Sequence, residues 1–322
     1  LREGRGFGSL LTSFGLWLYD WLAGVSVVDR RKMLSRWQTL RAEPLLGKEG
    51  VKGGGLYAEY RTDDARLTIE IAKAAVDYGA VLTNYTRVTS FQYAGKQVTG
   101  VQVTDELSQE SLSVLATCVI NATGPWVDEL RQFDNSKRGK TLHLTKGVHI
   151  VVPRERYPIK QAIYFDVADG RIIFANPRGE ITYIGTTDTD YDKTIDGVSI
   201  ASEDVDYLLK AVNESFPSVN LTRNDVQSGW AGLRPLVHEE GKSASELSRK
   251  DEIFESPSGL LSIAGGKLTG YRKMAERVID LAIKRHFEVK NLRDCFTYKI
   301  TLAGGGLKSD KRVKRYGRAI AK

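Results

Sequence analysis

Four short segments of the chain place basic side chains among apolar or glycine residues. They are Thr145–His149, Ser228–Pro235, Ser248–Asp251 and Gly266–Lys267. Arg234 stands between a leucine and a proline, and a guanidinium in such surroundings requires a carboxylate or phosphate partner, which it binds with two hydrogen bonds. If the segments come together in the fold, they predict a site for an anionic substrate.

Two basic residues of these segments have simpler explanations when each is taken alone. His149 lies in an apolar strand, where a histidine is more often a satisfied core residue than a base. Arg249 is followed by Lys250 and Asp251, a pattern that is typical of a charged surface. Only a shared site would give them a role in chemistry, and their spacing along the chain leaves both explanations open.

The stretch Leu260–Val278 has an order of elements that suits an anion site. A short apolar run, Gly265-Gly266 and then apolar residues at helical spacing predict a strand, a tight turn and a helix. Glycines let the backbone approach a ligand closely, and a helix N-terminus offers free N–H groups and a partial positive charge. Lys267 and Thr269 stand at this turn, so it is suited to an anion or to negative charge that develops during a reaction. An ordinary strand–turn–helix connection explains the stretch equally well.

Other patterns that carry chemistry are missing from the sequence. Gly4–Gly8 has the wrong spacing for a G-x-G-x-x-G loop, and Gly53–Gly55 is not followed by a helical pattern. The two cysteines and four histidines have no metal-type spacing, so no metal site is expected. Widely separated cysteines favour a reduced, cytoplasmic compartment.

The basic character of the chain is concentrated at its end. The net charge is +7, and residues 308–322 alone carry seven Lys or Arg and one Asp. A segment of net charge +6 leaves +1 for the first 307 residues, so no nucleic-acid surface is expected on the folded body. The first residues, LREGRGFGSL, lack both a Met and a signal-peptide pattern, so we expect the chain to begin part-way through its gene product.

Residues 9–28 form the most apolar stretch of the chain. Leu10, Phe14, Trp17 and Trp21 follow the helical period, while one aspartate and four hydroxyl residues dilute the stretch. We therefore expect a buried helix rather than a membrane span, with a helix that lies in a membrane interface as the alternative.

The elements that must position these segments are of two kinds. Up to about residue 125 a helix and several strands indicate an α/β arrangement with an antiparallel ribbon. The helix is expected at Thr62–Tyr78 and the strands at Ala80–Tyr85, Arg87–Tyr93, Gln97–Thr104 and Leu112–Asn121. Short strands separated by turns then predict an antiparallel sheet. These elements are strands at Val148–Val152, Gln161–Asp166, Ile172–Asn176 and Ile181–Thr186, a helix capped by Ser202, and strands at Val226–Leu233 and Gly259–Ala264.

Seven runs of residues, spread in order over nearly the whole chain, match a known family. They are GGGLYAEYRTDDARL, VINATGPWVDELR, TKGVHIVV, YIGTTDTDY, SGWAGLRPL, SRKDEI and IAGGKLTGYRKMAE. Together they resemble the FAD-dependent glycerol-3-phosphate dehydrogenases. The resemblance implies a mixed α/β fold like that of D-amino-acid oxidase, with an interrupted FAD-binding domain and a substrate domain built on an antiparallel sheet. The implied parts are residues 1–60 as a joining segment, 61–136 and 257–285 as FAD domain, 137–256 as substrate domain, and 286–322 as the start of a C-terminal domain.

The resemblance also implies a reaction and its residues. It is the oxidation of sn-glycerol 3-phosphate at C2 to dihydroxyacetone phosphate, with a hydride passing to FAD and electrons leaving to a membrane quinone. His149 would accept the proton of the C2 hydroxyl, unless Arg234 is the group nearest to it, and Arg234, Arg249 and Lys267 would hold the phosphate or the reacting oxygen. The residues expected to line the cofactor are Val88, Ala122, Thr123, Gly124, Gly265, Gly266, Lys267, Leu268 and Thr269. The protein would be cytoplasmic, with contact to the inner face of the cell membrane and a homodimer as further expectations.

The chain departs from the family at both ends. The family's G-x-G-x-x-G turn, its Ser-Ser and His-Gly-Gly-Leu-Arg segments and its C-terminal helical domain do not occur in this sequence, which leaves FAD binding by this chain alone open. The related glycerophosphate oxidases, which reduce oxygen, carry a long insertion where only LVHEEGKSASEL separates Pro235 from Ser248 here. The dehydrogenase is therefore favoured. An amine or amino-acid oxidase of the same fold and a non-catalytic binding protein are the alternatives.

Overall fold

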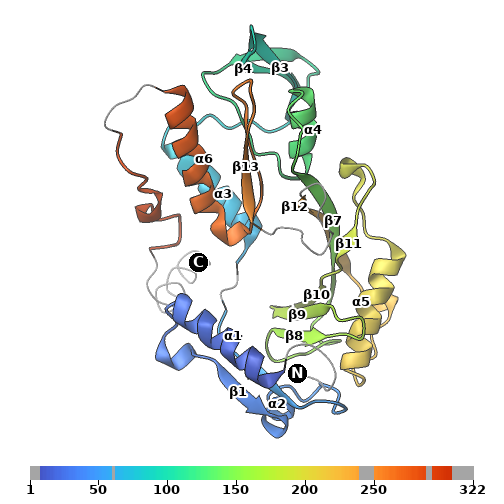
Figure 1. Cartoon of the computed structure of the whole chain (residues 1–322). Helices are drawn as coiled ribbons and strands as arrows, with labels where there is room; N and C mark the ends of the chain where they lie inside the picture. The colour runs from blue at the N-terminus through green and yellow to red at the C-terminus, as the bar shows by residue number, and fades with distance from the viewer. Residues whose placement is uncertain (1–7, 60–61, 239–249, 288–291, 307–322) are drawn as a thin grey trace, which may run out of the picture. The chain divides into compact units, whose positions relative to one another are not determined.

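The computed structural model describes residues 8–59, 62–238, 250–287 and 292–306. The chain forms two compact units (Figure 1). The first unit comprises residues 1–60 and 144–234, and the second comprises residues 61–143 and 235–322. Residues 1–60, which we expected to join two domains, thus belong to the first unit. The second unit resumes at Pro235 rather than at residue 257, because residues 251–255 pair with a strand of that unit.

The core of the first unit is a six-stranded sheet. Its strands follow the order β11-β7-β10-β9-β8, and β12 pairs with β7. Their bounds are β7 Thr141–Pro153, β8 Ile163–Asp166, β9 Ile172–Arg178, β10 Ile181–Gly185, β11 Thr189–Asp190 and β12 Ser228–His238. The pairs β7–β10, β10–β9, β9–β8 and β7–β11 are antiparallel, which confirms the antiparallel sheet predicted for this part of the chain.

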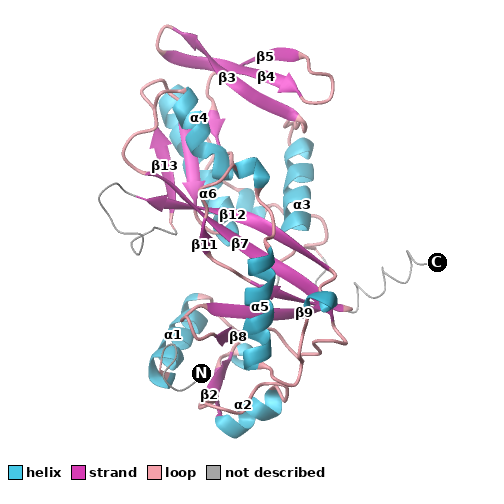
Figure 2. Ribbon diagram, turned by 90° about the vertical axis from the view of Figure 1, so that its right-hand side faces the viewer, coloured by secondary structure: helices cyan, strands magenta, loops and turns pink. Residues whose placement is uncertain are grey.

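Alternate side chains of β7 point to opposite faces of this sheet. Val148, Ile150 and Val152 are fully buried on one face, in the same apolar cluster as Leu208 and Val212 of helix α5, Ser202–Ser215. Figure 2 shows α5 lying along the sheet. The odd-numbered positions of β7, which include the predicted His149, therefore face away from α5.

The N-terminal part of the first unit contains two helices and a strand pair. These elements are α1 Ser9–Leu22, β1 Lys32–Ser35, α2 Arg36–Ala42 and β2 Gly53–Leu56. A capping box begins α2, because Ser35 Oγ accepts a hydrogen bond from the N–H of Gln38 and Gln38 Oε1 accepts one from the N–H of Ser35. The Gly53–Gly55 cluster lies in β2, antiparallel to β1.

Helix α1 is confirmed as a helix, but the prediction that it is buried is wrong. Leu10, Phe14 and Trp21 are 87%, 58% and 69% exposed. Asp20, by contrast, is only 8% exposed, and its carboxylate accepts a hydrogen bond from the N–H of Arg31. The Arg31 guanidinium also donates to a backbone carbonyl of the helix. These polar contacts turn the aspartate side of α1 toward its own unit and leave the apolar side outward.

The described residues of the second unit form two three-stranded sheets and three α-helices. One sheet is antiparallel and consists of β3 Thr86–Ala94, β4 Gln97–Asp105 and β5 Ser111–Leu115. In the other, β14 Leu261–Gly265 pairs antiparallel with β13 Asp251–Glu255 and parallel with β6 Ile120–Asn121. The helices are α3 Asp64–Asp77, α4 Val127–Phe133 and α6 Tyr271–His286.

Two predicted strands of this unit differ from the structure. Ala80–Tyr85 is not a strand: Val81 is 90% exposed, and Tyr85 has a φ of 53°, outside the region that strands occupy. Leu112–Asn121 consists of β5 and β6, which belong to different sheets. A run that reads as one strand therefore does not reveal that the chain changes sheet within it.

Short 3-10 turns complete the fold at Val27–Asp29, Gly124–Trp126, Ile195–Gly197, Arg223–Asp225, Leu268–Gly270 and Thr297–Lys299. None of the helices within the described ranges is long and apolar enough to cross a membrane. The same residues contain no group of three or more His, Cys, Asp or Glu side chains arranged to hold a metal ion.

Candidate active site

His149 lies among aromatic rings on the sheet face that points away from α5. Its imidazole is stacked on the indole of Trp230 in β12, with centroids 4.8 Å apart and planes inclined by 12°. The rings of Phe174 in β9 and Tyr183 in β10 approach it with centroid distances of 5.4 and 6.4 Å. Four strands thus contribute to one half-buried cluster around the imidazole.

A second tyrosine and a carboxylate extend this cluster. The ring of Tyr164 packs on Phe174 at 5.8 Å, and its hydroxyl donates a hydrogen bond of 3.2 Å to Glu59 Oε2. Burial, together with the nearby Glu59 charge, raises the pKa of Tyr164 to about 12. The same two causes raise the pKa of Tyr57 above its ordinary value. Both phenols therefore stay neutral at physiological pH and keep their hydrogen-bond donors.

Arg234 of β12 is held by the segment that follows β10. Its Nη2 donates to Thr186 Oγ1 at 2.8 Å, and its Nη1 donates to the carbonyl of Thr187 at 3.3 Å and to Asp188 Oδ1 at 3.2 Å. The Arg234 side chain is 36% exposed. Asp188 is thus the carboxylate partner that the sequence required for this guanidinium.

The guanidinium of Arg234 also rests on β7. A Cβ built on Gly147 would lie 2.5 Å from Nη2 and 2.7 Å from Cζ of Arg234, so the two groups are in close contact. His149 follows Gly147 by two residues in β7 and therefore lies on the same face of the sheet. The structure brings together the predicted base and the predicted arginine.

Lys146 precedes Gly147 in β7, but its side chain lies on the α5 side of the sheet and has a partner there. Its Nζ lies 2.5 Å from Asp204 Oδ2, and the two side chains are 13% and 7% exposed. Asp204 also accepts a hydrogen bond from the N–H of Ala201, which is the N-cap of α5 in place of the predicted Ser202. This buried ion pair joins β7 to the start of α5.

Apart from Val88, the cofactor residues predicted in the second unit lie at one edge of a sheet. Strands β6 and β14 run parallel, so their carboxyl ends lie side by side. Ala122, Thr123 and Gly124 follow β6, while Gly265 ends β14 and Gly266 to Thr269 follow it. In open α/β sheets, ligands bind at this carboxyl edge.

Asn121, at the end of β6, links β6 to β14 by a side-chain hydrogen bond. Its Nδ2 donates to the carbonyl of Val127 at 2.9 Å and to Ser262 Oγ of β14 at 3.2 Å. Its Oδ1 accepts a hydrogen bond of 2.8 Å from the Thr123 hydroxyl. Asn121 is 2% exposed, so these bonds satisfy a buried amide and fix the segment after β6 against β14.

The glycine turn after β14 is confirmed, with one difference in the helix that follows. Gly265 and Gly266 have φ values of 76° and 80°, which residues other than glycine rarely adopt. Helix α6 begins only at Tyr271, after the 3-10 turn Leu268–Gly270. Lys267 therefore precedes this short turn instead of standing at the first turn of the long helix.

Other predicted residues are not brought into these two groups. Val88 lies in β3, opposite Val103, in the separate antiparallel sheet. Lys267 belongs to the second unit and Arg234 to the first, so their meeting at one substrate stays a prediction. Arg249 lies outside the described residues.

The residues that orient His149 and Arg234 were missed by sequence reasoning. They are the rings of Phe174, Tyr183 and Trp230 and the acceptors Thr186 and Asp188. The sequence gives a weak signal for the rings, since β9, β10 and β12 each carry an aromatic residue on the face of the sheet where His149 lies. The acceptors belong to the hydroxyl-rich run GTTDTD that follows β10.

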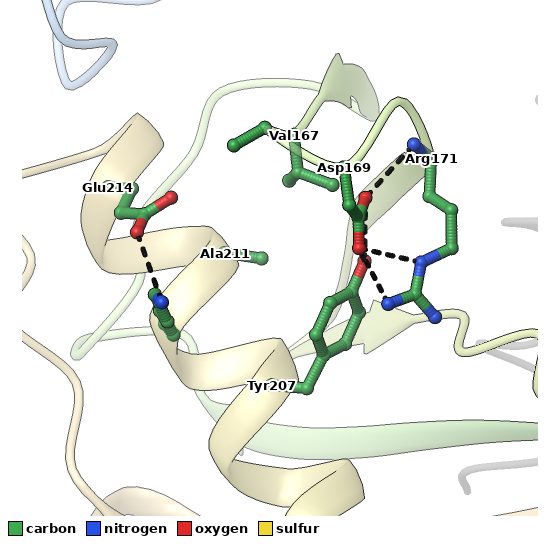
Figure 3. A pocket seen from close by; sticks show the side chains of 8 residues that line it. Val167, Asp169, Arg171, Tyr207, Ala211 and Glu214 are labelled. Carbon is green, nitrogen blue, oxygen red and sulfur yellow. Dashed lines mark hydrogen bonds and ion pairs between the residues drawn. The ribbon is translucent and has the colours of Figure 1, made fainter.

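A separate cavity of about 260 Å³ lies beside α5 in the first unit (Figure 3). The residues labelled in that view are Val167, Asp169, Arg171, Tyr207, Ala211 and Glu214. The charges in this cavity pair with one another: Arg171 Nη2 lies 2.6 Å from Asp169 Oδ2, and Lys210 Nζ lies 3.9 Å from Glu214 Oε1. No residue predicted for catalysis lines it.

Comparison with known proteins assigns the chain to a family. The family model for FAD-dependent oxidoreductases matches residues 9–272. The chain belongs to this family. It is 51% identical over 323 residues to the aerobic glycerol-3-phosphate dehydrogenase of Bacillus subtilis, a match that covers 100% of this chain and 58% of that protein. The corresponding protein of Staphylococcus aureus strain USA300 is 51% identical over 320 residues, with 98% and 58% covered. The chain thus spans a little over half the length of these curated relatives.

Solved structures confirm the fold expected from the sequence. The glycerol-3-phosphate dehydrogenase from Bacillus halodurans, complexed with FAD, is similar with a TM-score of 0.80 and 53% identity, over 88% of this chain and 55% of that one. Glycine oxidase from Bacillus cereus is similar with a TM-score of 0.61 and 20% identity, over 88% and 73% of the two chains. The second likeness concerns the fold alone. Both agree with a mixed α/β flavoprotein of the D-amino-acid-oxidase type.

Proposed function

We propose that this protein oxidises sn-glycerol 3-phosphate at C2 to dihydroxyacetone phosphate and passes a hydride to FAD. The observation that carries the proposal is the shared face of His149 and Arg234, where an imidazole and a guanidinium lie beside the same strand. These groups suit a substrate that offers both a hydroxyl proton and negative charge. The proposal agrees with the names of relatives that are 51% and 53% identical to this chain.

The two side chains have different tasks in this reaction. His149 accepts the proton of the C2 hydroxyl, since a neutral imidazole nitrogen is a good acceptor near neutral pH. Arg234 supplies positive charge to the phosphate or to the oxygen at C2. Its bonds to Thr186 and Asp188 hold the guanidinium in one orientation before substrate binds, which reduces the entropic cost of binding.

The carboxyl edge of β6 and β14 fits a dinucleotide cofactor. A Cβ at Gly124 would meet nothing within 4 Å, so backbone at this edge is open to a ligand. Gly265 and Gly266 have positive φ, and a Cβ at either position would lie 2.7 Å from a protein atom, Lys250 O or Met274 Sδ, so these glycines let the turn pack closely on its neighbours. We assign Ala122 to Gly124 and Gly265 to Thr269 to the flavin and Val88 to the adenine region. FAD, when bound, supplies the acceptor for the hydride of C2.

We further propose that electrons pass to a membrane quinone and that the cytoplasmic protein rests on the inner face of the cell membrane. The outward side of α1 supports this contact. Leu10, Trp21 and Leu22 are 87%, 69% and 70% exposed, and tryptophan and leucine on one side of a helix favour a membrane interface. A homodimer stays an expectation of the family resemblance.

The test uses the intact protein, glycerol 3-phosphate and a reducible dye without oxygen. The expected result is loss of the oxidised flavin absorption and reduction of the dye. A coloured protein that glycerol 3-phosphate fails to bleach would refute the proposal. Arg234→Ala is expected to raise KM far more than the control Arg138→Ala, whose side chain is exposed. Equal effects would remove Arg234 from the site.

Two alternatives give different results in the same assay. An oxidase produces stoichiometric hydrogen peroxide when oxygen replaces the dye, whereas a quinone-linked dehydrogenase prefers the dye or a soluble quinone. An amine or amino-acid oxidase of the same fold is reduced by amino compounds and is indifferent to a phosphate competitor.

A further inference from the structure

Two glycines of the first unit touch the two side chains to which chemistry is assigned. An ideal Cβ at Gly147 of β7 would lie 2.5 Å from Nη2 and 2.7 Å from both Cζ and Nη1 of Arg234. An ideal Cβ at Gly185 of β10 would lie 2.6 Å from Nε2 of His149. Real Cβ atoms essentially never approach another heavy atom within 3.0 Å. The arginine and the histidine therefore occupy space that any other residue at these positions would take.

A positive φ is not the reason why these two positions are glycine. Neither Gly147 nor Gly185 has a positive φ, unlike Gly265 and Gly266 of the second unit. An alanine could adopt the backbone at Gly147, which lies inside β7. At both positions the nearest atoms to the Cβ position are those of Arg234 or His149, and they leave no room for the extra methyl group.

The contact geometry differs between the two pairs. Three guanidinium atoms of Arg234 lie at nearly equal distances from the Cβ position of Gly147, so the flat side of the guanidinium rests on the backbone. Gly185 is the residue directly opposite His149 in the β10–β7 pair. The imidazole therefore leans over a position without a side chain and stacks on Trp230, 4.8 Å away.

We propose that Gly147 and Gly185 are positioning residues for Arg234 and His149. To restore an ordinary contact of 3.4 Å or more, an added Cβ at Gly147 would have to push the guanidinium by about 1 Å, and misplacement on that scale can cost about 100-fold in rate. The same argument holds for Gly185 and the imidazole. The positions of both groups follow from the structure alone, whereas the effect on turnover rests on the proposed function.

The position of His149 can be tested without flavin turnover or substrate. The intact protein is labelled with carbon-13 at histidine Cε1, and His149→Gln assigns the resonance. Since the imidazole stacks on Trp230, the indole ring current shifts this resonance, and Gly185→Ala is expected to move it. Gly232→Ala in β12 is the control, because a Cβ there meets nothing within 4 Å. An unmoved resonance in Gly185→Ala, or an equal movement in the control, would overturn the role of Gly185 whatever reaction the protein catalyses.

If Gly185→Ala does not fold, a double variant decides the matter. Combining it with His149→Ala removes the imidazole and leaves room for the new methyl group. Recovery of folding, measured by thermal unfolding, supports the proposal. A double variant that is as unfolded as Gly185→Ala would overturn it, because the methyl group would then clash with something other than His149.

Gly147 is tested by a mutant cycle with Arg234, measured as kcat/KM for glycerol 3-phosphate. Gly147→Ala is expected to lower kcat/KM by about 100-fold in the native background. On the Arg234→Ala background it is expected to change kcat/KM by less than about twofold, because the group that it displaces is gone. Equal factors in both backgrounds would show that Gly147 acts on the fold instead of on Arg234. Absence of activity in the native protein would refute the proposed reaction, while the histidine resonance would still report on Gly185.

Discussion

Replacing Asp204 by asparagine is expected to destabilise the first unit strongly. Asp204 Oδ2 lies 2.5 Å from Nζ of Lys146, and the two side chains are only 7% and 13% exposed. Asparagine keeps a side-chain oxygen that can accept the hydrogen bond from the N–H of Ala201. It removes the charge, so Lys146 is left as a buried cation without a counter-ion.

The expected size of this effect follows from the burial of the pair. Removing one partner of a buried ion pair costs about 3–5 kcal/mol, because the remaining charge is neither hydrated nor paired. A loss of 1 kcal/mol lowers the melting temperature by about 2–4 °C for a unit of about 150–250 residues. The transition of the first unit is therefore expected to fall by about 6–20 °C.

The assay is calorimetric unfolding of the intact protein, with an ion pair on the same helix as control. Lys210 and Glu214 of α5 lie 3.9 Å apart with 76% and 45% of their side chains exposed. Glu214→Gln should therefore change the free energy of unfolding by less than about 1 kcal/mol. Lys146→Met added to Asp204→Asn should recover most of the loss, because it removes the unpaired charge. Equal losses in the two single variants, or no recovery in the double variant, would refute this reasoning.

Three further predictions concern other parts of the chain. The Arg156 guanidinium and the backbone N–H of Thr222 hold the pKa of Asp225 well below its ordinary value. The stability that this carboxylate contributes is therefore present above about pH 4 and lost in more acidic solution, so the melting temperatures of native protein and Asp225→Asn should converge as the pH falls below about 4. Trp21→Ser should weaken sedimentation with anionic vesicles, whereas Val81→Ser, at a side chain that is 90% exposed in the second unit, should not. Asn121→Ala should lower stability by about 1–3 kcal/mol and reduce the flavin content, since it breaks hydrogen bonds of a buried amide at the carboxyl edge.

Most helices and strands can be predicted from the sequence, because each depends mainly on residues that are close together along the chain. Period-2 alternation and turn residues locate the strands of the first unit's sheet, and the glycine pair at Gly265-Gly266 marks a turn that requires positive φ. Arg234 could be singled out for the same reason, since a guanidinium between apolar neighbours needs an acceptor. The acceptor itself, Asp188, is 46 residues away, and nothing in the spacing identifies it.

Features that depend on pairing between distant residues could not be predicted in this way. The aromatic stripe of α1 indicates an amphipathic helix but does not say which side faces its own unit. In the structure, Asp20 accepts a hydrogen bond from the N–H of Arg31, and this contact places the polar side of α1 against the first unit. The break between β5 and β6 could not be predicted from the sequence either, because both strands have β-branched residues and they differ only in the strands with which they pair.

Strand β7 contributes one face to the core of the first unit and the other face to the candidate site. Val148 and Ile150 are fully buried against the cluster that includes α5, while Gly147 and His149 face the opposite side. Because successive residues of a strand point in opposite directions, a substitution on one face leaves the packing of the other face in place. A glycine in a strand interior weakens the strand, since it has no side chain to pack. Here the buried residues on either side of Gly147 offset that loss and hold the backbone where the Arg234 guanidinium rests on it.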